Sequence, residues 1–161
     1  MKKFVSVLLV ALSAIVVLTA CSTKSNKKSE SSTASSSHVF EPKDTSNASI
    51  RKIETYGDYI IMAKKIYDEG YGDYDERATK LFANDLVKDL KETYDSFKAD
   101  AERVLVTEAE DKYGDRKNEE ITREDKDKLV KTLIGQRKSA EITRESLADQ
   151  EKIMEEHNSS K

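Results

Sequence analysis

The scarcity of helix-breaking residues after residue 42 constrains the fold of this chain more than any other feature. The 161 residues include one proline, Pro42, and five glycines. Proline cannot donate the backbone hydrogen bond that a helix interior needs, and glycine costs about 1 kcal/mol there relative to alanine. Lys, Glu, Asp and Ala are abundant, which is typical of long exposed helices rather than sheets. We therefore predict an all-α domain.

Apolar residues recur at alternating steps of three and four in three segments, which is the pattern of a helix with one packed face. The spacing predicts helices over about 46–68, 74–113 and 122–156, with glycines in the segments that separate them. At 1.5 Å per residue, the second helix would be about 60 Å long. The buried stripes that we expect are Ile53, Tyr56, Ile60, Ala63 and Tyr67 in the first helix, Ala83, Leu86, Leu90, Tyr94, Phe97, Ala101 and Val104 in the second, and Val130, Leu133, Ala140, Leu147 and Met154 in the third.

Three helices joined by short turns imply an elongated antiparallel three-helix bundle, which we place at residues 44–158 before a frayed tail at 159–161. The first helix is shorter than the other two. The second and third are therefore expected to project beyond it as a long, coiled-coil-like hairpin. Arg137 and Arg144 fall on the apolar seam of the third helix, so we expect this seam to pack less tightly and to leave room for a partner.

A low-complexity segment precedes the helices. Residues 22–38 read STKSNKKSESSTASSSH, and these side chains offer nothing that could be buried to offset the entropy of ordering them. We predict a flexible tether over 21–43. At roughly 5–6 Å × √n, such a tether would hold the domain about 20–25 Å from its anchor on average.

The first twenty residues have the three zones of an export signal. Lys2 and Lys3 form a cationic head, residues 4–17 are almost wholly apolar, and small residues follow. The apolar part has about 15 residues, fewer than the roughly 20 that span a bilayer as a helix. We therefore predict a signal peptide over 1–20 rather than a retained transmembrane anchor.

The single cysteine of the chain directly follows this signal. The string LTAC, formed by Leu18, Thr19, Ala20 and Cys21, resembles the lipobox of bacterial lipoprotein precursors. In that family the cysteine sulfur receives a diacylglyceryl group, and a dedicated signal peptidase then cleaves before the cysteine. The resemblance covers residues 1–21. It implies lipidation of Cys21, cleavage between Ala20 and Cys21, and a location at the cell membrane facing outside the cytoplasm.

Lipidation would decide how the protein is held. Each buried methylene contributes about 0.8 kcal/mol, and two acyl chains hold a protein firmly where one does not. The membrane is thus an expected partner, through the lipid on Cys21. The lipid would also use the sole thiol, so no disulfide is expected. The lysine- and serine-rich composition leans toward a Gram-positive source.

The mature chain carries many charged residues of both signs. Without Lys2 and Lys3, 26 basic and 31 acidic residues remain, which gives a formal net charge of −5. Because nucleic-acid binding needs a basic face, we expect no nucleic-acid partner.

The side chains that usually carry catalysis are badly placed. The two histidines, His38 and His157, lie in the predicted tether and near the C-terminus, away from any serine in the helices. Five scattered glycines supply no phosphate-binding loop. The acidic segment 68–76 does not match the ligand order of a calcium loop, so a solvated turn is the favoured interpretation. We therefore expect that the chain is not an enzyme and that it binds no cofactor, metal or small-molecule substrate.

Tyrosines and the two seam arginines are the residues that favour a protein partner. The string YGDY occurs at 56–59 and again at 71–74, where it falls beside a predicted turn. Tyrosine and arginine are enriched in protein interfaces. The candidate partner contacts are Tyr71, Tyr74, Arg137 and Arg144.

These features favour a membrane-anchored surface lipoprotein that acts as a non-catalytic helical protein-interaction module. Roles consistent with this class are an adaptor of a secretion or conjugation machine, an immunity or exclusion factor, and a host-facing surface protein. A different class is peptide signalling, because residues 13–20, SAIVVLTA, resemble the pheromones that some Gram-positive bacteria release from lipoprotein signal peptides. A solute-binding lipoprotein would need two domains with a cleft, for which this chain is too short.

Overall fold

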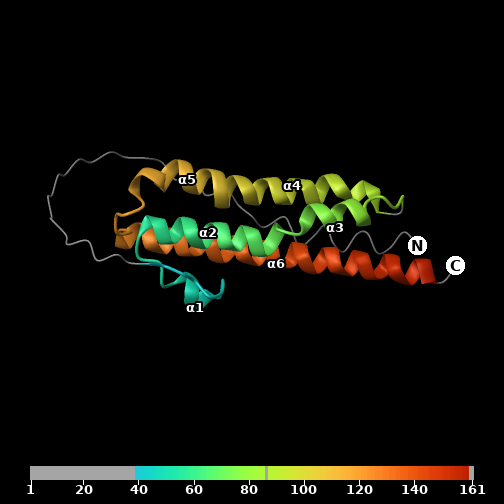
Figure 1. Cartoon of the computed structure of the whole chain (residues 1–161), viewed down its shortest axis with the longest axis horizontal. Helices are drawn as coiled ribbons and strands as arrows, with labels where there is room; N and C mark the ends of the chain where they lie inside the picture. Colours follow the sequence, from blue (N-terminus) through green and yellow to red (C-terminus); the bar gives the residue numbers. More distant parts are fainter. Residues whose placement is uncertain (1–38, 86, 160–161) are drawn as a thin grey trace. The chain divides into compact units, whose positions relative to one another are not determined.

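The computed structural model describes residues 39–85 and 87–159, and this part of the chain is helical (Figure 1). The β-type pairing in it is one isolated bridge between Thr55 and Glu120. The all-α prediction is therefore confirmed. The predicted signal peptide, the lipobox and the tether up to residue 38 lie outside the described residues.

The first predicted helix is divided into two. Helix α1 (Asn47–Ile50) begins after Ser46, whose side chain accepts a hydrogen bond from the amide of Ser49. Helix α2 (Tyr56–Tyr71) begins at a capping box, in which Thr55 and Asp58 exchange side-chain to backbone hydrogen bonds. Asp58 is buried, at 3% exposure. The continuous helix predicted over 46–68 is thus wrong, because this cap restarts the helix.

The chain bends after α2 but does not reverse. Gly72 has helical backbone angles, φ −61° and ψ −31°, so it continues the helical backbone although the sequence predicts a break here. Helix α3 (Tyr74–Leu81) then continues in the direction of α2 (Figure 1). Asp73 precedes it without making a side-chain cap.

The reversal occurs after Leu81, inside the segment predicted as one helix over 74–113, so that prediction is corrected. The carbonyl oxygen of Asn84 accepts hydrogen bonds from the amides of Val87 and Lys88, at 3.1 and 3.0 Å. Phe82 and Val87 are buried at this turn, at 7% and 6% exposure. The turn lacks glycine and proline, and its apolar residues continue the helical spacing, so periodicity alone predicts a helix here.

The chain returns in the opposite direction over residues 88–116, and this return segment contains a π-helical turn. Because a π turn holds one residue more than an α turn, it shifts the buried stripe: Leu105 is buried at 1% exposure, whereas the predicted Val104 is half-buried. Ala109 follows on the same face, at 1% exposure. The elements of this return segment are η1 (Lys88–Leu90), α4 (Lys91–Glu102), the π turn η2 (Arg103–Thr107), α5 (Glu108–Tyr113) and η3 (Gly114–Arg116).

The last helix matches its prediction. Helix α6 (Arg123–Ser159) has 37 residues and is about 55 Å long. The hydroxyl of Thr122 accepts a hydrogen bond from the amide of Asp125 at 3.1 Å, which caps its first turn. The five residues of its predicted stripe are all buried: Val130, Leu133, Ala140, Leu147 and Met154.

Helix α6 lies beside α2 and runs in the same direction, whereas α4 and α5 run the opposite way (Figure 1). The loop before α6 is tied to the start of α2. The amide of Gly57 donates to the carbonyl of Lys117 at 2.9 Å, and the amide of Ile121 donates to that of Glu54 at 2.8 Å. A side chain at Gly57 would place its Cβ 2.8 Å from the Lys117 oxygen, so this approach requires glycine.

An aromatic cluster fixes the same end of the domain. The ring of Tyr56 stacks on that of Tyr113 at 4.9 Å between centroids, and the Arg116 guanidinium lies 4.2 Å from the centroid of the Tyr56 ring. The Tyr56 hydroxyl donates to Asp125 at 2.8 Å. Three elements are therefore joined through one fully buried tyrosine.

Candidate partner-binding groove

The four predicted partner contacts fall into two environments. Tyr71 and Tyr74 are each only 4% exposed. Tyr71 packs against Tyr67, with 5.7 Å between ring centroids. In this conformation both rings belong to the core and offer no surface to a partner. Arg137 and Arg144 instead line a groove.

This groove, the α2–α6 groove, has a volume of about 650 Å³ and lies between the α2–α3 arm and α6. Its apolar lining is made by Ile66, Gly70, Ala140 and Ala148. A smaller hollow of about 420 Å³ lies beside Ile61, but its lining comes from α2 alone. Of these two hollows, the α2–α6 groove is the one whose walls come from more than one element.

Two small residues bring the walls of the groove together. A Cβ built on Gly70 would lie 2.6 Å from the Cβ of Ala140, closer than real Cβ atoms approach. The absence of a side chain at Gly70 thus lets α2 pack directly on α6. It also leaves the groove lined by backbone and methyl groups at this point.

Arg137 is incompletely satisfied by the chain itself. Its Nη2 lies 3.4 Å from Asn47 Oδ1, and its Nη1 lies 3.5 Å from Glu141 Oε2. Both distances are longer than those of a good N–H···O bond. Its Nε is buried and has no hydrogen-bond partner within the described part of the chain. A guanidinium has five N–H donors, so this one has capacity left for a ligand.

Arg144 has one strong contact and one weak one. Its Nη1 donates to the backbone carbonyl of Glu69 at 2.8 Å, in the last turn of α2, where a cation is favourable. Its Nη2 lies 3.9 Å from a carboxylate oxygen of Asp73. The side chain is 50% exposed. Part of its guanidinium therefore faces solvent in the groove.

Polar contacts mark the two ends of the groove. At one end the hydroxyl of Thr45 donates to Glu69 at 2.7 Å. At the other end Arg77 forms a two-pronged ion pair with Glu151, with N–O distances of 2.8 and 3.0 Å. This pair raises the pKa of Arg77, chiefly through the hydrogen bond from Arg77 to Glu151.

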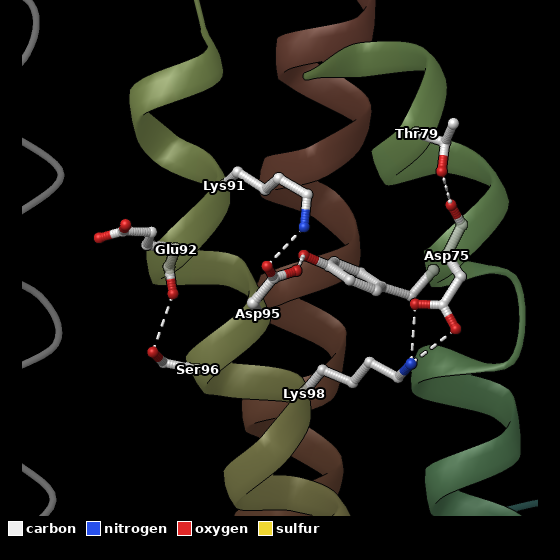
Figure 2. A network of polar contacts seen from close by, with 8 residues as sticks. Asp75, Thr79, Lys91, Glu92, Asp95, Ser96 and Lys98 are labelled. Carbon is white, nitrogen blue, oxygen red and sulfur yellow. Dashed lines mark hydrogen bonds and ion pairs between the residues drawn. The ribbon is translucent and has the colours of Figure 1, made fainter. Parts of the chain in front are cut away.

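A second polar network joins α3 to α4 (Figure 2). The hydroxyl of Tyr74 donates to Asp95 at 2.8 Å, and Lys91 donates to the other oxygen of that carboxylate at 2.5 Å. Lys98 reaches Asp75 on α3 at 2.7 and 2.8 Å. The hydrogen bond from Lys91, followed by that from Tyr74, lowers the pKa of Asp95. This network stabilises the packing of α3 on α4.

Tyr74→Phe should lower the free energy of unfolding by about 1–2 kcal/mol, because it removes a hydrogen bond to a carboxylate while keeping the ring. Tyr113→Phe is the matched control, since the Tyr113 hydroxyl makes no hydrogen bond to a described residue and its removal should change stability little. Urea titration followed by circular dichroism measures both. Equal effects of the two variants would contradict the assigned role of Tyr74.

The carboxylates of the acidic segment 68–76 are all paired with cations, at N–O distances of 2.6–3.8 Å. The pairs are Asp68 with Lys64, Glu69 with Lys65, Asp73 with Arg77, Asp75 with Lys98, and Glu76 with Lys80. Over residues 39–85 and 87–159, no three His, Cys, Asp or Glu side chains gather as metal ligands would. None of the helices in the same ranges is both long and apolar enough to cross a bilayer.

Sequence reasoning missed two residues that shape the groove. Gly70 was assigned to a turn, although its role is the contact with Ala140. Asn47, which reaches Arg137 across 90 positions of sequence, is a candidate helix cap in the sequence, but no local pattern predicts this contact. The spacing of Gly70 from the apolar stripe could have indicated a helix contact, because Tyr56, Ala63 and Gly70 stand seven residues apart.

The described part of the chain is thus an all-α domain with a mixed-charge groove on one face. Comparison with known proteins found no family model, no curated protein and no solved structure that matches this chain.

Proposed function

We propose that this chain is a lipoprotein, anchored outside the cytoplasmic membrane through Cys21, whose helical domain binds a protein without catalysing a reaction. In this proposal α2 with α3, the return segment from η1 to η3, and α6 form one elongated antiparallel bundle at the end of the tether. The sequence LTAC supports the anchor. The role would be that of an adaptor in a membrane machine or of an immunity or exclusion factor.

The observation that carries the binding function is the unused hydrogen-bonding capacity of Arg137. A buried N–H without a partner is costly, and such groups are rare in folded proteins. Arg144 adds a second guanidinium seven residues along α6, on the same face of the helix. Arginine also supplies planar donors that recognise carboxylates and backbone carbonyls. A protein segment in the groove would accept hydrogen bonds from the Nη groups of both arginines, because both side chains are partly exposed.

The anchor is tested with Cys21→Ser. We expect this variant to keep residues 1–20 and to leave the lipid-anchored membrane pool almost completely, because two acyl chains can no longer be attached. Cell fractionation and gel mobility measure both effects, and Ser22→Ala is the control that should behave as wild type. Normal maturation and membrane retention of Cys21→Ser would contradict the lipoprotein proposal.

The binding function is tested by cross-linking on intact cells. The wild-type chain should be captured in a defined complex, and the variant Arg137→Glu/Arg144→Glu should lose it. Lys131→Glu, an exposed reversal on α6 outside the groove, should keep the complex. Circular dichroism shows whether each variant is folded. A complex that survives reversal of both arginines would place binding elsewhere.

A further inference from the structure

The charges that α6 presents to the groove alternate in sign. Arg137, Glu141 and Arg144 are spaced by four and three residues, so they share one face of the helix, and Ala148 follows four residues later. The opposite wall carries Glu69, Asp73 and Arg77, so it too presents both signs. A purely acidic or purely basic segment would therefore meet repulsion somewhere along the groove. The occupant that fits is one whose own charges alternate.

We propose that the α2–α6 groove binds helix α6 of a second copy of this chain, arranged antiparallel. This inference rests on the proposed function and names the partner of the same groove. A two-fold axis midway between Glu141 and Arg144 places Glu141 opposite Arg144 of the second copy, and Arg144 opposite its Glu141. Each ion pair is formed twice, as in any two-fold interface.

The same two-fold axis also determines which residue of the second copy lies opposite Arg137. It places Arg137 opposite Ala148 of the second copy, so the aliphatic stem of the arginine packs on a methyl group. Each α6 then lies in the groove of the other copy. Ala148 is exposed on this face of α6, and its small side chain allows the close approach of the facing helix at an interaxial distance of about 8–10 Å.

The length of the groove predicts the strength of this dimer. Along α6 the end contacts of the groove lie at Arg137, which contacts Asn47, and at Glu151, which contacts Arg77. These two positions are 14 residues apart, or about 21 Å. A stable interface usually buries about 800 Å² per partner, and a groove this short offers less. The dimer is therefore weak in solution and sensitive to salt. Confinement of both copies to one membrane raises their effective concentration and favours it.

Cysteine cross-linking of the full-length chain in its membrane tests the arrangement. In the antiparallel dimer two Glu145→Cys residues are separated by about 8 Å along the helix axes, whereas two Glu155→Cys residues are about 38 Å apart. A bismaleimide with a spacer of about 10 Å should therefore link Glu145→Cys chains and leave Glu155→Cys chains as monomers. The chain without an introduced cysteine is the background. Equal linking of both variants, or of neither, would overturn the antiparallel dimer.

Charge exchange provides the second test, in the Glu145→Cys background. Glu141→Arg and Arg144→Glu should each reduce the linked fraction roughly tenfold, because two attractive pairs become two repulsive ones. The double variant should recover most of the linked dimer, since the exchanged charges are again complementary. Failure of the double variant to recover, with its helical signal intact, would overturn the pairing. Capture of a different protein through the groove, with no linked dimer, would overturn the pairing while leaving the proposed binding function in place.

Discussion

Gly70→Ala is expected to destabilise the domain, although alanine is the better helix former. The added Cβ would lie 2.6 Å from the Cβ of Ala140, and a methyl group fixed to a helix backbone cannot rotate away. Helix α6 must therefore move from α2. Overpacking of this kind costs about 1–3 kcal/mol, which exceeds the gain of up to about 1 kcal/mol from helix propensity. Urea titration followed by circular dichroism gives the change in the free energy of unfolding.

Two further variants separate packing from propensity. Gly135→Ala lies in the same kind of helix interior, but its Cβ would have no neighbour within 4 Å, so it should stabilise the domain by about 1 kcal/mol. Gly70→Ala combined with Ala140→Gly moves the methyl group from one helix to the other and should recover much of the loss. Stabilisation by Gly70→Ala alone would show that the two helices are not in contact at this point.

Helical structure should be lost as the pH rises above about 10, because burial raises the pKa of six of the seven tyrosines. The pKa of Tyr67 rises to about 12. A raised phenol pKa contributes stability that is complete below the unfolded value near 10 and is lost as the pH climbs through the folded value. The six residues are Tyr56, Tyr59, Tyr67, Tyr71, Tyr74 and Tyr94.

The expected loss is steep. Each such phenol lowers the free energy of unfolding by about 1.4 kcal/mol per pH unit between its two pKa values, and a domain is stable by only about 5–15 kcal/mol. The free energy of unfolding should therefore fall progressively as the pH rises above 10. Circular dichroism and tyrosinate absorbance should change together. Tyr59→Phe should move the midpoint to higher pH, whereas tyrosines that ionise near pH 10 in a fully helical protein would contradict the burial.

Local signals predicted the ends of some helices and not others. Helix α6 was predicted within three residues at each end, because Thr122 caps it and one apolar stripe runs along its whole length. The reversal after Leu81 was missed because Asn84 turns the chain without glycine or proline, so the apolar spacing hides it. The π turn η2 was missed for a related reason, since one extra residue in a turn leaves no mark in composition.

The candidate groove was only half predictable. Arg137 and Arg144 were predicted because a charged residue on an apolar seam stands out in one helix. Tyr71 and Tyr74 were expected at a surface, yet both are core residues, because the chain passes Gly72 as a helix and carries them inward. Contacts between elements distant in sequence, such as Asn47 with Arg137, depend on the tertiary arrangement and have no local signature.

The contacts of Thr45 with Glu69 and of Asn47 with Arg137 have a mechanical consequence. Both contacts join the N-terminal segment of the domain to the end of the groove. A pull on the chain at Val39 would load these two bonds before it reached the capped start of α2, and their rupture would release the Arg137 guanidinium. Tension on the N-terminal segment would therefore change the surroundings of Arg137 at the end of the groove.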